Sequence, residues 1–135
     1  MEECIFCKIV AGTIPSYRVA ESKHFLAILD ITPATHGHTL IIPKQHYENL
    51  LLLPTTLGDE LIVLVQKVAP VLMKLTESQG CNIGVNNGPV AGQVVMHLHV
   101  HIIPRKENDG LSHWPRSPAT SEELTDFCQM VREKL

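Results

Sequence analysis

The stretch Gly92-Gln-Val-Val-Met-His-Leu-His-Val-His-Ile-Ile-Pro-Arg105 carries His97, His99 and His101 at every second position of a largely apolar segment. Because side chains alternate between the two faces of a strand, this spacing predicts a strand with the three imidazoles on one face. The opposite, core-facing side would then carry Leu98, Val100 and Ile102.

The spacing of the row argues against one shared role for its histidines. At about 3.3 Å per residue, His97 and His101 would lie roughly 13 Å apart along a strand, whereas zinc ligand nitrogens lie within about 2.1 Å of the metal. All three could bind one metal only around a sharp bend. A zinc hydrolase built on the whole row is therefore the least favoured interpretation, and we expect the three histidines to have different tasks.

The chemistry that best suits this row is attack on phosphorus. A neutral imidazole is a nucleophile when one nitrogen is held protonated and the other is free. Neighbouring histidines, the backbone N–H groups of Gly92 and Gln93, and Lys44 or Arg105 could donate to phosphate oxygens. No serine or cysteine lies in an obvious nucleophile motif. The stretch therefore indicates phosphoryl or nucleotidyl transfer rather than acyl transfer.

Length and charge restrict the class of protein. A chain of 135 residues predicts one domain, spanning residues 1–135. Eleven basic against fourteen acidic residues give a formal charge of −3, which argues against nucleic acid or an acidic membrane as partner. The chain shows neither an apolar run of membrane-spanning length nor a signal peptide, so we expect no membrane association and a cytoplasmic location.

The hydrophobic pattern predicts an α+β fold with a mostly antiparallel sheet of about five strands. The strands are expected within residues 17–22, 24–31, 38–43, 81–88 and 92–105, and a short helical turn over 5–10 is expected to end at Gly12.

A long central helix is expected after Pro54, with Thr56 in a capping pattern and a kink or break at Pro70. Its buried stripe would consist of Leu57, Leu61, Leu64, Val65, Val68, Val71, Leu72 and Leu75. A C-terminal helix capped by Thr120 would turn one apolar face to the core, made of Leu124, Phe127, Cys128, Val131 and Leu135.

Cys4 and Cys7 have the two-residue gap that lets both thiolates reach one zinc ion. The pair alone is a weak signal, since a redox dithiol or two cysteines without a role fit it as well. Zinc would need two more ligands. The spacing leaves open which histidines supply them, among His24, His36, His46, His97 and His113.

The segment His97-Leu-His-Val-His-Ile-Ile103 resembles the signature of the histidine triad family. The resemblance extends to "LDITPATHGHTLIIPKQH" (29–46), "GVNNGPVAGQ" (84–93) and "CIFCKIVAGTIPS" (4–16). It implies the histidine triad fold, a homodimer, and hydrolysis or transfer at the α-phosphate of purine nucleoside monophosphate derivatives, of the phosphoramidate type.

The resemblance also implies roles for individual residues. His99 is similar to the nucleophile that forms a nucleotidyl-histidine intermediate, and His101 and His38 resemble its partners. Asp30 resembles the acid that binds the ribose hydroxyls. The remaining nucleotide contacts would come from the apolar walls Phe6, Ile9, Leu29 and Leu40, and from the loop residues Asn86, Gly92, Gln93 and Val94.

Val94 departs from the family pattern, because many members have serine or threonine after the Gly-Gln pair. The chain therefore lacks one hydroxyl donor, so the phosphate is either held less tightly or bound by backbone amides instead. Trp114 is interpreted either as a residue near the active site, across a dimer interface, or as an ordinary surface residue.

In a zinc-carrying branch of the family, the ligands correspond here to Cys4, Cys7, His46 and His97. Four protein ligands leave no open position, so this zinc would be structural. No organic cofactor is expected.

Two alternatives remain open from the sequence. One is a diadenosine polyphosphate hydrolase of the same family. The other is an adaptor that binds nucleotide or zinc without turnover.

Overall fold

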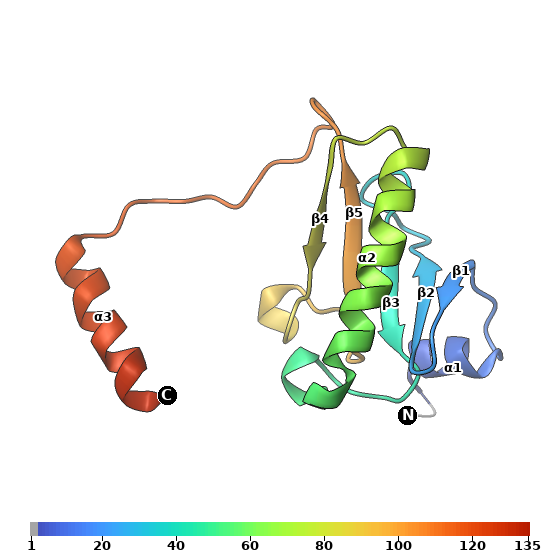
Figure 1. Cartoon of the computed structure of the whole chain (residues 1–135), viewed down its shortest axis with the longest axis horizontal. Helices are drawn as coiled ribbons and strands as arrows, with labels where there is room; N and C mark the ends of the chain where they lie inside the picture. The colour runs from blue at the N-terminus through green and yellow to red at the C-terminus, as the bar shows by residue number, and fades with distance from the viewer. Residues whose placement is uncertain (1–2) are drawn as a thin grey trace.

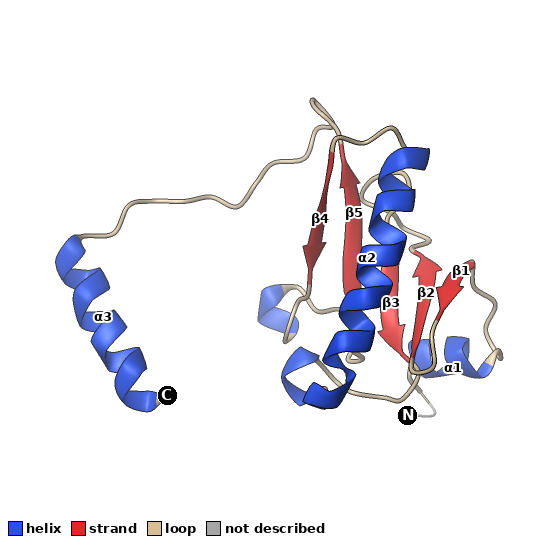
Figure 2. Cartoon of the chain, in the orientation of Figure 1, coloured by secondary structure: helices blue, strands red, loops and turns tan. Residues whose placement is uncertain are grey.

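The computed structural model describes residues 3–135 and contains a five-stranded antiparallel sheet with the strand order β1-β2-β3-β5-β4 (Figure 1). The α+β expectation is thereby confirmed. The strands are β1 (Arg18–Glu21), β2 (Phe25–Leu29), β3 (Thr39–Pro43), β4 (Gly80–Gly84) and β5 (Val100–Arg105). The helices are α1 (Ile5–Ala11), α2 (Gly58–Leu75) and α3 (Ser121–Lys134), with short 3-10 turns at Leu50–Leu52, Thr55–Leu57 and Pro89–Ala91 (Figure 2).

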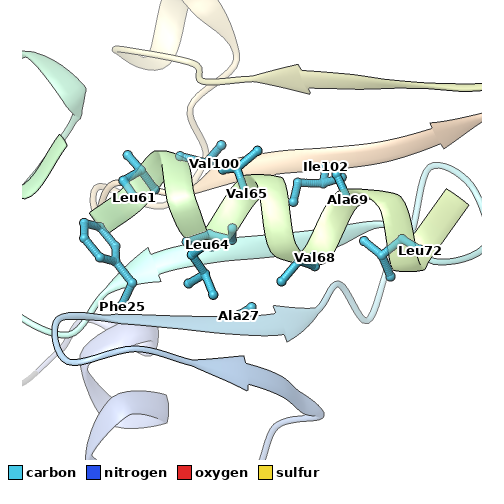
Figure 3. Close-up of a cluster of buried hydrophobic side chains, with 11 residues drawn as sticks. Phe25, Ala27, Leu61, Leu64, Val65, Val68, Ala69, Leu72, Val100 and Ile102 are labelled. Carbon is cyan, nitrogen blue, oxygen red and sulfur yellow. The ribbon is translucent and has the colours of Figure 1, made fainter. Parts of the chain in front are cut away.

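Two apolar clusters cover the two faces of the sheet. Alternate residues of the central strands point to opposite faces, so Phe25 and Ala27 pack under α2 while Leu26 and Ile28 pack under α1. Figure 3 shows α2 lying across the first face, with its inward side chains against β2 and β5. Within residues 3–135, no helix combines the length and apolarity that crossing a membrane requires.

The long helix differs from its prediction at both ends. Thr56 lies in a 3-10 turn, and no side chain caps α2, which begins at Gly58. Of the kink or break expected at Pro70, the break is wrong, because α2 continues through this residue to Leu75, while the kink stays a prediction. Pro70 lies on the exposed side of the helix. There, water can bind the carbonyl that the missing N–H leaves free.

The predicted buried stripe of α2 is also too long. Val71 and Leu75 are 55% and 75% exposed, whereas the core residues from Leu61 to Leu72 are buried as expected. Helical periodicity gives the direction of a side chain, but it does not say how far the sheet beneath it extends.

The strand predicted over residues 92–105 is much shorter. β5 begins only at Val100, so His97 and His99 lie in the bent chain before it and only His101 lies in the strand. The side chain of His97 contacts Cys4, Cys7 and His46, whereas His99 packs against His101. Apolar Leu98 and Ile102 are nevertheless fully buried, as alternation predicts.

α3 forms over the predicted residues, but it does not pack against the core as predicted. Thr120 and Glu123 make the expected reciprocal capping box. The predicted contact with the core is wrong, because all residues of α3 are exposed. Figure 1 shows the helix apart from the sheet, at the end of an extended segment that leaves the top of β5.

Glu60, in the first turn of α2, ties the helix to the β1–β2 turn. One of its carboxylate oxygens accepts hydrogen bonds from the Ser22 hydroxyl and the backbone N–H of His24, and the other lies 2.7 Å from Nδ1 of His24. The Ser22 and His24 hydrogen bonds lower the pKa of Glu60 to about 2. The folded state therefore favours the ionised carboxylate.

We predict that Glu60→Gln lowers the melting temperature at pH 7. A depressed pKa in the folded state stabilises it above the unfolded pKa near 4.5, and that stabilisation is lost as the pH falls toward about 2. The difference in melting temperature between wild type and variant should therefore shrink from pH 6 to pH 3. The matched control is Asp59→Asn at the same helix start, and an equal effect of both variants would contradict the assignment.

Candidate active site and metal centre

Two cysteines of the N-terminal segment and two histidines meet beside the start of α1. Nδ1 of His97 lies 3.4 Å from Sγ of Cys4 and 3.5 Å from Sγ of Cys7, and Nδ1 of His46 lies 3.3 Å from Sγ of Cys7. All four ligand atoms lie within 4.8 Å of one another. The set is the Cys₂His₂ combination typical of structural zinc.

The hydrogen bonding of His97 fits a metal ligand. Nε2–H donates to the carbonyl oxygen of Pro43 at 2.9 Å, so the Nδ1 lone pair faces the thiols. Burial lowers the pKa of His97 to about 4, which keeps the ring neutral. Nδ1 of His46 lies only 3.1 Å from Nδ1 of His97, as expected when both nitrogens address a shared cation. Burial and the neighbouring Cys4 raise the pKa of Cys7, a penalty that a bound cation would reverse.

The other histidines that the sequence left open as ligands lie elsewhere. His24 is bonded to Glu60, His113 lines a separate cleft, and His36 is exposed in the loop before β3. The tertiary fold, rather than sequence spacing, therefore determines which histidines lie beside Cys4 and Cys7.

His97, which contacts Cys4 and Cys7, also positions His99. Its Nδ1 lies 2.7 Å from the backbone carbonyl oxygen of His97, which can only accept, so Nδ1 carries the proton. The edge of Phe6 packs against the ring, with centroids 5.2 Å apart. His99 is only 7% exposed. In the neutral tautomer, Nε2 is therefore the nitrogen that keeps its lone pair.

A second chain of hydrogen bonds fixes the proton of His101. The backbone N–H of Ala34 donates to Nδ1 of His38 at 3.0 Å, so the His38 proton must be on Nε2. That N–H donates to Nδ1 of His101 at 2.9 Å, which leaves the His101 proton on Nε2. Among the described residues, this buried Nε2–H has no hydrogen-bond partner. This N–H can therefore donate a hydrogen bond to a ligand.

Burial keeps both partner rings neutral. It lowers the pKa of His101 to about 4, helped by His99 and His38. Burial also lowers the pKa of His38, although nearby Asp30 opposes the shift. Asp30 lies with one carboxylate oxygen 3.7 Å from Nε2 of His38, while its other oxygen accepts from the backbone N–H of Thr32. The proton positions follow from this neutrality.

His38 and His101 line a cleft of about 620 Å³. β4 forms one wall through Asn82, Ile83 and Gly84, and residues 111–115 form another. Trp114 belongs to this second wall and is 85% exposed, so the structure places it by the triad of its own chain. A ligand in the cleft would meet the free N–H of His101.

The loop that was predicted to bind phosphate uses its backbone N–H groups for hydrogen bonds within the protein. The backbone N–H groups of Gly92 and Gln93 donate to the carbonyls of Pro89 and Gly88, so neither is free for phosphate. Gln93 is buried, and its side-chain amide bonds within the protein, to the backbone of Gly88, Glu48 and Val95. Its observed contacts hold the loop together. Asn86 packs against Gly92, which takes a positive φ of 96°.

The two cationic side chains considered as phosphate donors are also occupied. Arg105 binds both carboxylate oxygens of Asp109, and Lys44 pairs with Glu21. Val94 is exposed beside the loop and offers no hydroxyl. Of the phosphate donors that the sequence suggested, the histidine N–H groups are therefore the ones that remain.

The apolar residues predicted to enclose the base lie together in part. Phe6, Ile9 and Leu40 belong to one buried cluster between α1 and the sheet, and Phe6 also contacts the His97 and His99 rings. Leu29, at the end of β2, is partly buried. Sequence reasoning missed three backbone groups, the N–H of Ala34 and the carbonyls of Pro43 and His97, because a backbone group leaves no residue-type signal.

Comparisons with known proteins agree with this geometry. A family model described as the HIT domain matches residues 11–108. An adenosine 5'-monophosphoramidase of Schizosaccharomyces pombe is 40% identical over 134 residues, covering 98% of each chain. A crystal structure from Streptococcus mutans aligns with 99% of this chain and 86% of its own at a TM-score of 0.93 and 41% identity.

A zinc-bound histidine triad family protein from Mycobacterium smegmatis is also similar. It is 39% identical, with a TM-score of 0.77, over 90% of this chain and 87% of its own. Together with the cluster of Cys4, Cys7, His46 and His97, this likeness fits a zinc site here.

The hydrogen bonds predict a specific proton position on each ring. At pH 7, long-range ¹H–¹⁵N correlation spectra should show His99 protonated on Nδ1, and His38 and His101 protonated on Nε2. Because burial disfavours the charged form, His101 should stay neutral until the pH falls toward about 4. The spectrum of His101→Gln assigns the signal. A charged His101 at pH 6, or one protonated on Nδ1, would refute the scheme.

Proposed function

The chain belongs to the HIT domain family, and from that premise we propose that it is a nucleotide hydrolase or transferase. Its substrates are purine nucleoside monophosphate derivatives of the phosphoramidate type, and the reaction occurs at the α-phosphate. The observation that carries the proposal is the state of His99, whose Nδ1–H is held by the His97 carbonyl while Nε2 keeps its lone pair.

In the first step, Nε2 of His99 forms a bond to the α-phosphorus and the bond from phosphorus to the leaving nitrogen breaks. The intermediate is a nucleotidyl-histidine. Its ring becomes electron-poor, and the hydrogen bond from Nδ1–H to the His97 carbonyl grows stronger as that charge develops. Nε2–H of His101 donates to a phosphate oxygen, where negative charge gathers.

In the second step, water attacks the phosphorus and the bond to His99 breaks. The leaving nitrogen takes a proton from solvent as its bond to phosphorus breaks in the first step. In the second step the attacking water gives its hydroxyl to phosphorus and a proton back to solvent, so His99 returns to its starting form. The neutral pair of His38 and His101 donates through the same Nε2–H in both steps and needs no net change of proton.

The nucleoside part binds beside the triad. Asp30 accepts hydrogen bonds from the ribose hydroxyls through the oxygen that faces His38, since its other oxygen is occupied by Thr32. The apolar walls for the purine are Phe6, Ile9, Leu29 and Leu40. In the loop, Asn86, Gly92 and Val94 contact the phosphate side, and Gln93 serves by fixing the loop shape.

Cys4, Cys7, His46 and His97 hold a structural zinc ion. When bound, zinc supplies a fixed crosslink between the N-terminal segment and the sheet rather than a reacting group. Because His97 also carries the carbonyl that orients His99, an ordered metal cluster keeps the nucleophile aligned.

The homodimer and the cytoplasmic location that the sequence suggested stay predictions. A diadenosine polyphosphate hydrolase keeps the same triad but releases a second nucleotide. Turnover of an adenosine phosphoramidate and of a diadenosine polyphosphate by one enzyme sample separates these two activities. Nucleotide binding without turnover of either compound would instead favour the adaptor.

We predict that His99→Asn lowers turnover of an adenosine phosphoramidate by several orders of magnitude, because no other nitrogen takes the nucleophile's place. Adenosine monophosphate should still bind, as calorimetry can measure. The control is His36→Asn, which removes an exposed imidazole outside the site. Turnover by His99→Asn at the wild-type rate would exclude the proposed mechanism.

For the metal, we expect one zinc per chain in the wild-type protein and close to none in Cys7→Ser, measured by atomic emission after dialysis. Losing the ion should also lower the melting temperature, since metal binding is coupled to folding. Cys128→Ser is the matched control because that cysteine lies on α3, away from the cluster. Full zinc content in Cys7→Ser would rule out this ligand set.

A further inference from the structure

The loop between β2 and β3, residues 30–38, brings three groups of the candidate site together. Asp30 lies at its start and His38 at its end, and the backbone N–H of Ala34 donates to Nδ1 of His38 at 3.0 Å. Figure 1 shows the loop at the end of the sheet where β5 and α2 also end. Because His38 in turn donates to His101, the position of this loop decides where the free N–H of His101 points.

The middle of the loop has little packing to hold it in place. Residues 31–34 and His36 are exposed, whereas Thr35 between them is half-buried. Within residues 3–135, only the Thr35 hydroxyl ties residues 31–36 to a strand outside the loop, by donating to the backbone carbonyl of Pro104 at 2.7 Å. Exposed segments with few contacts open easily. The position of the Ala34 N–H therefore depends strongly on this hydrogen bond.

The strand pairing explains why Pro104 accepts this bond. β3 pairs with β5 only as far as Thr39 and Ile102, so Pro104 lies two residues beyond the last β3 partner. Pro104 is fully buried, and a buried carbonyl needs a hydrogen-bond donor. The Thr35 hydroxyl supplies the donor that a longer β3 would have supplied. The loop is thereby fixed to the strand that carries His101.

Gly37 places the loop against the rest of the molecule next to His38. Its φ of 88° favours glycine, and a Cβ atom there would lie 2.8 Å from Cγ2 of Thr76, the residue after α2. Thr76 cannot easily give way, because its hydroxyl donates to the carbonyl of Leu72. The close contact at Gly37 and the hydrogen bond of Thr35 therefore seat the loop against both α2 and β5.

We propose that Thr35 is a positioning residue of the triad, whose hydrogen bond to Pro104 keeps the Ala34 N–H on His38. Without this bond the loop can move, and the Ala34 N–H no longer decides which nitrogen of His38 carries the proton. If the proton moves to Nδ1 of His38, His101 pairs with the bare Nε2 by placing its own proton on Nδ1. Nε2 of His101 then has a lone pair in place of a donor.

The kinetic consequence rests on the proposed function, in which Nε2–H of His101 donates to a phosphate oxygen. Loss of that donor slows the chemical step, because negative charge gathers on this oxygen in the transition state. Nucleoside binding should change less. Asp30 is also held by its backbone N–H, which donates to the carbonyl of His38 at 2.9 Å. We therefore expect kcat to fall while KM stays close to the wild-type value.

The test compares single substitutions in the full-length protein. Thr35→Val and Thr35→Ala both remove the hydroxyl, the first with nearly the same shape, and Thr35→Ser keeps it. The matched control is Thr125→Val, which removes a hydroxyl that donates to the carbonyl of Ser121, also at 2.7 Å, on α3. Each protein is measured for its melting temperature and for kcat and KM with an adenosine phosphoramidate. Long-range ¹H–¹⁵N correlation at pH 7 gives the ring protons of His38 and His101.

Both hydroxyl-free variants should lower kcat about five- to tenfold, since one net hydrogen bond changes the population of the held loop by about this factor. Part of the His38 and His101 signal should move to the Nδ1-protonated form. Thr35→Ser should restore the wild-type kcat and spectrum, and Thr125→Val should leave them unchanged.

Unchanged ring protons in the hydroxyl-free variants would overturn the proposal, even with a lower melting temperature, because the role of Thr35 would then be purely structural. An unchanged kcat in an active enzyme would overturn it as well. The spectra need no turnover. A wild-type protein that cleaves no phosphoramidate would thus refute the proposed function, while the ring protons would still decide whether Thr35 positions the triad.

Discussion

The candidate site depends on the contacts that His97 makes from its fully buried position. One ring nitrogen donates to the carbonyl of Pro43 on β3, and the other faces the thiols of Cys4 and Cys7. Its own carbonyl accepts the Nδ1–H of His99. One residue thus joins the N-terminal segment, the sheet and the nucleophile, and a displacement of His97 would misalign His99 at once.

A second constraint of the same kind acts on the other two histidines. The backbone N–H of Ala34 sets the tautomer of His38, which sets that of His101, so a main-chain group decides where the free donor points. Two backbone groups therefore assign opposite tasks to neighbouring imidazoles: His99 presents a lone pair and His101 presents an N–H. Burial keeps His38 and His101 neutral, without which the arrangement of protons would be lost.

Part of the fold and of the site could be predicted because it follows from local patterns. The alternation around His97 to His101, the apolar period of α2 and the Thr120 capping box all describe contacts within a few residues. The pairing of the cysteines with His46 and His97 came only from the family resemblance, since residues so far apart in sequence are brought together by the sheet. The predicted α+β fold with its antiparallel sheet is confirmed on this basis.

The errors share a physical cause. Periodicity says which face of α3 is apolar but not which body covers it, so Phe127 and Val131 were placed in the core although they are exposed. Residue type says that Gly92, Gln93 and Arg105 can donate but not that the loop and Asp109 already use their donors. In each case, the sequence shows the capacity of a group, while the partner that occupies it depends on the tertiary fold.

The most direct test of the account is intact-mass spectrometry of the protein mixed rapidly with an adenosine phosphoramidate, followed by peptide mapping. The account predicts a transient adduct of one adenylyl group per chain, mapped to His99, which decays as adenosine monophosphate forms. An adduct on another residue would contradict the account. So would steady turnover with no adduct at any mixing time, under conditions in which formation of the adduct is faster than its hydrolysis.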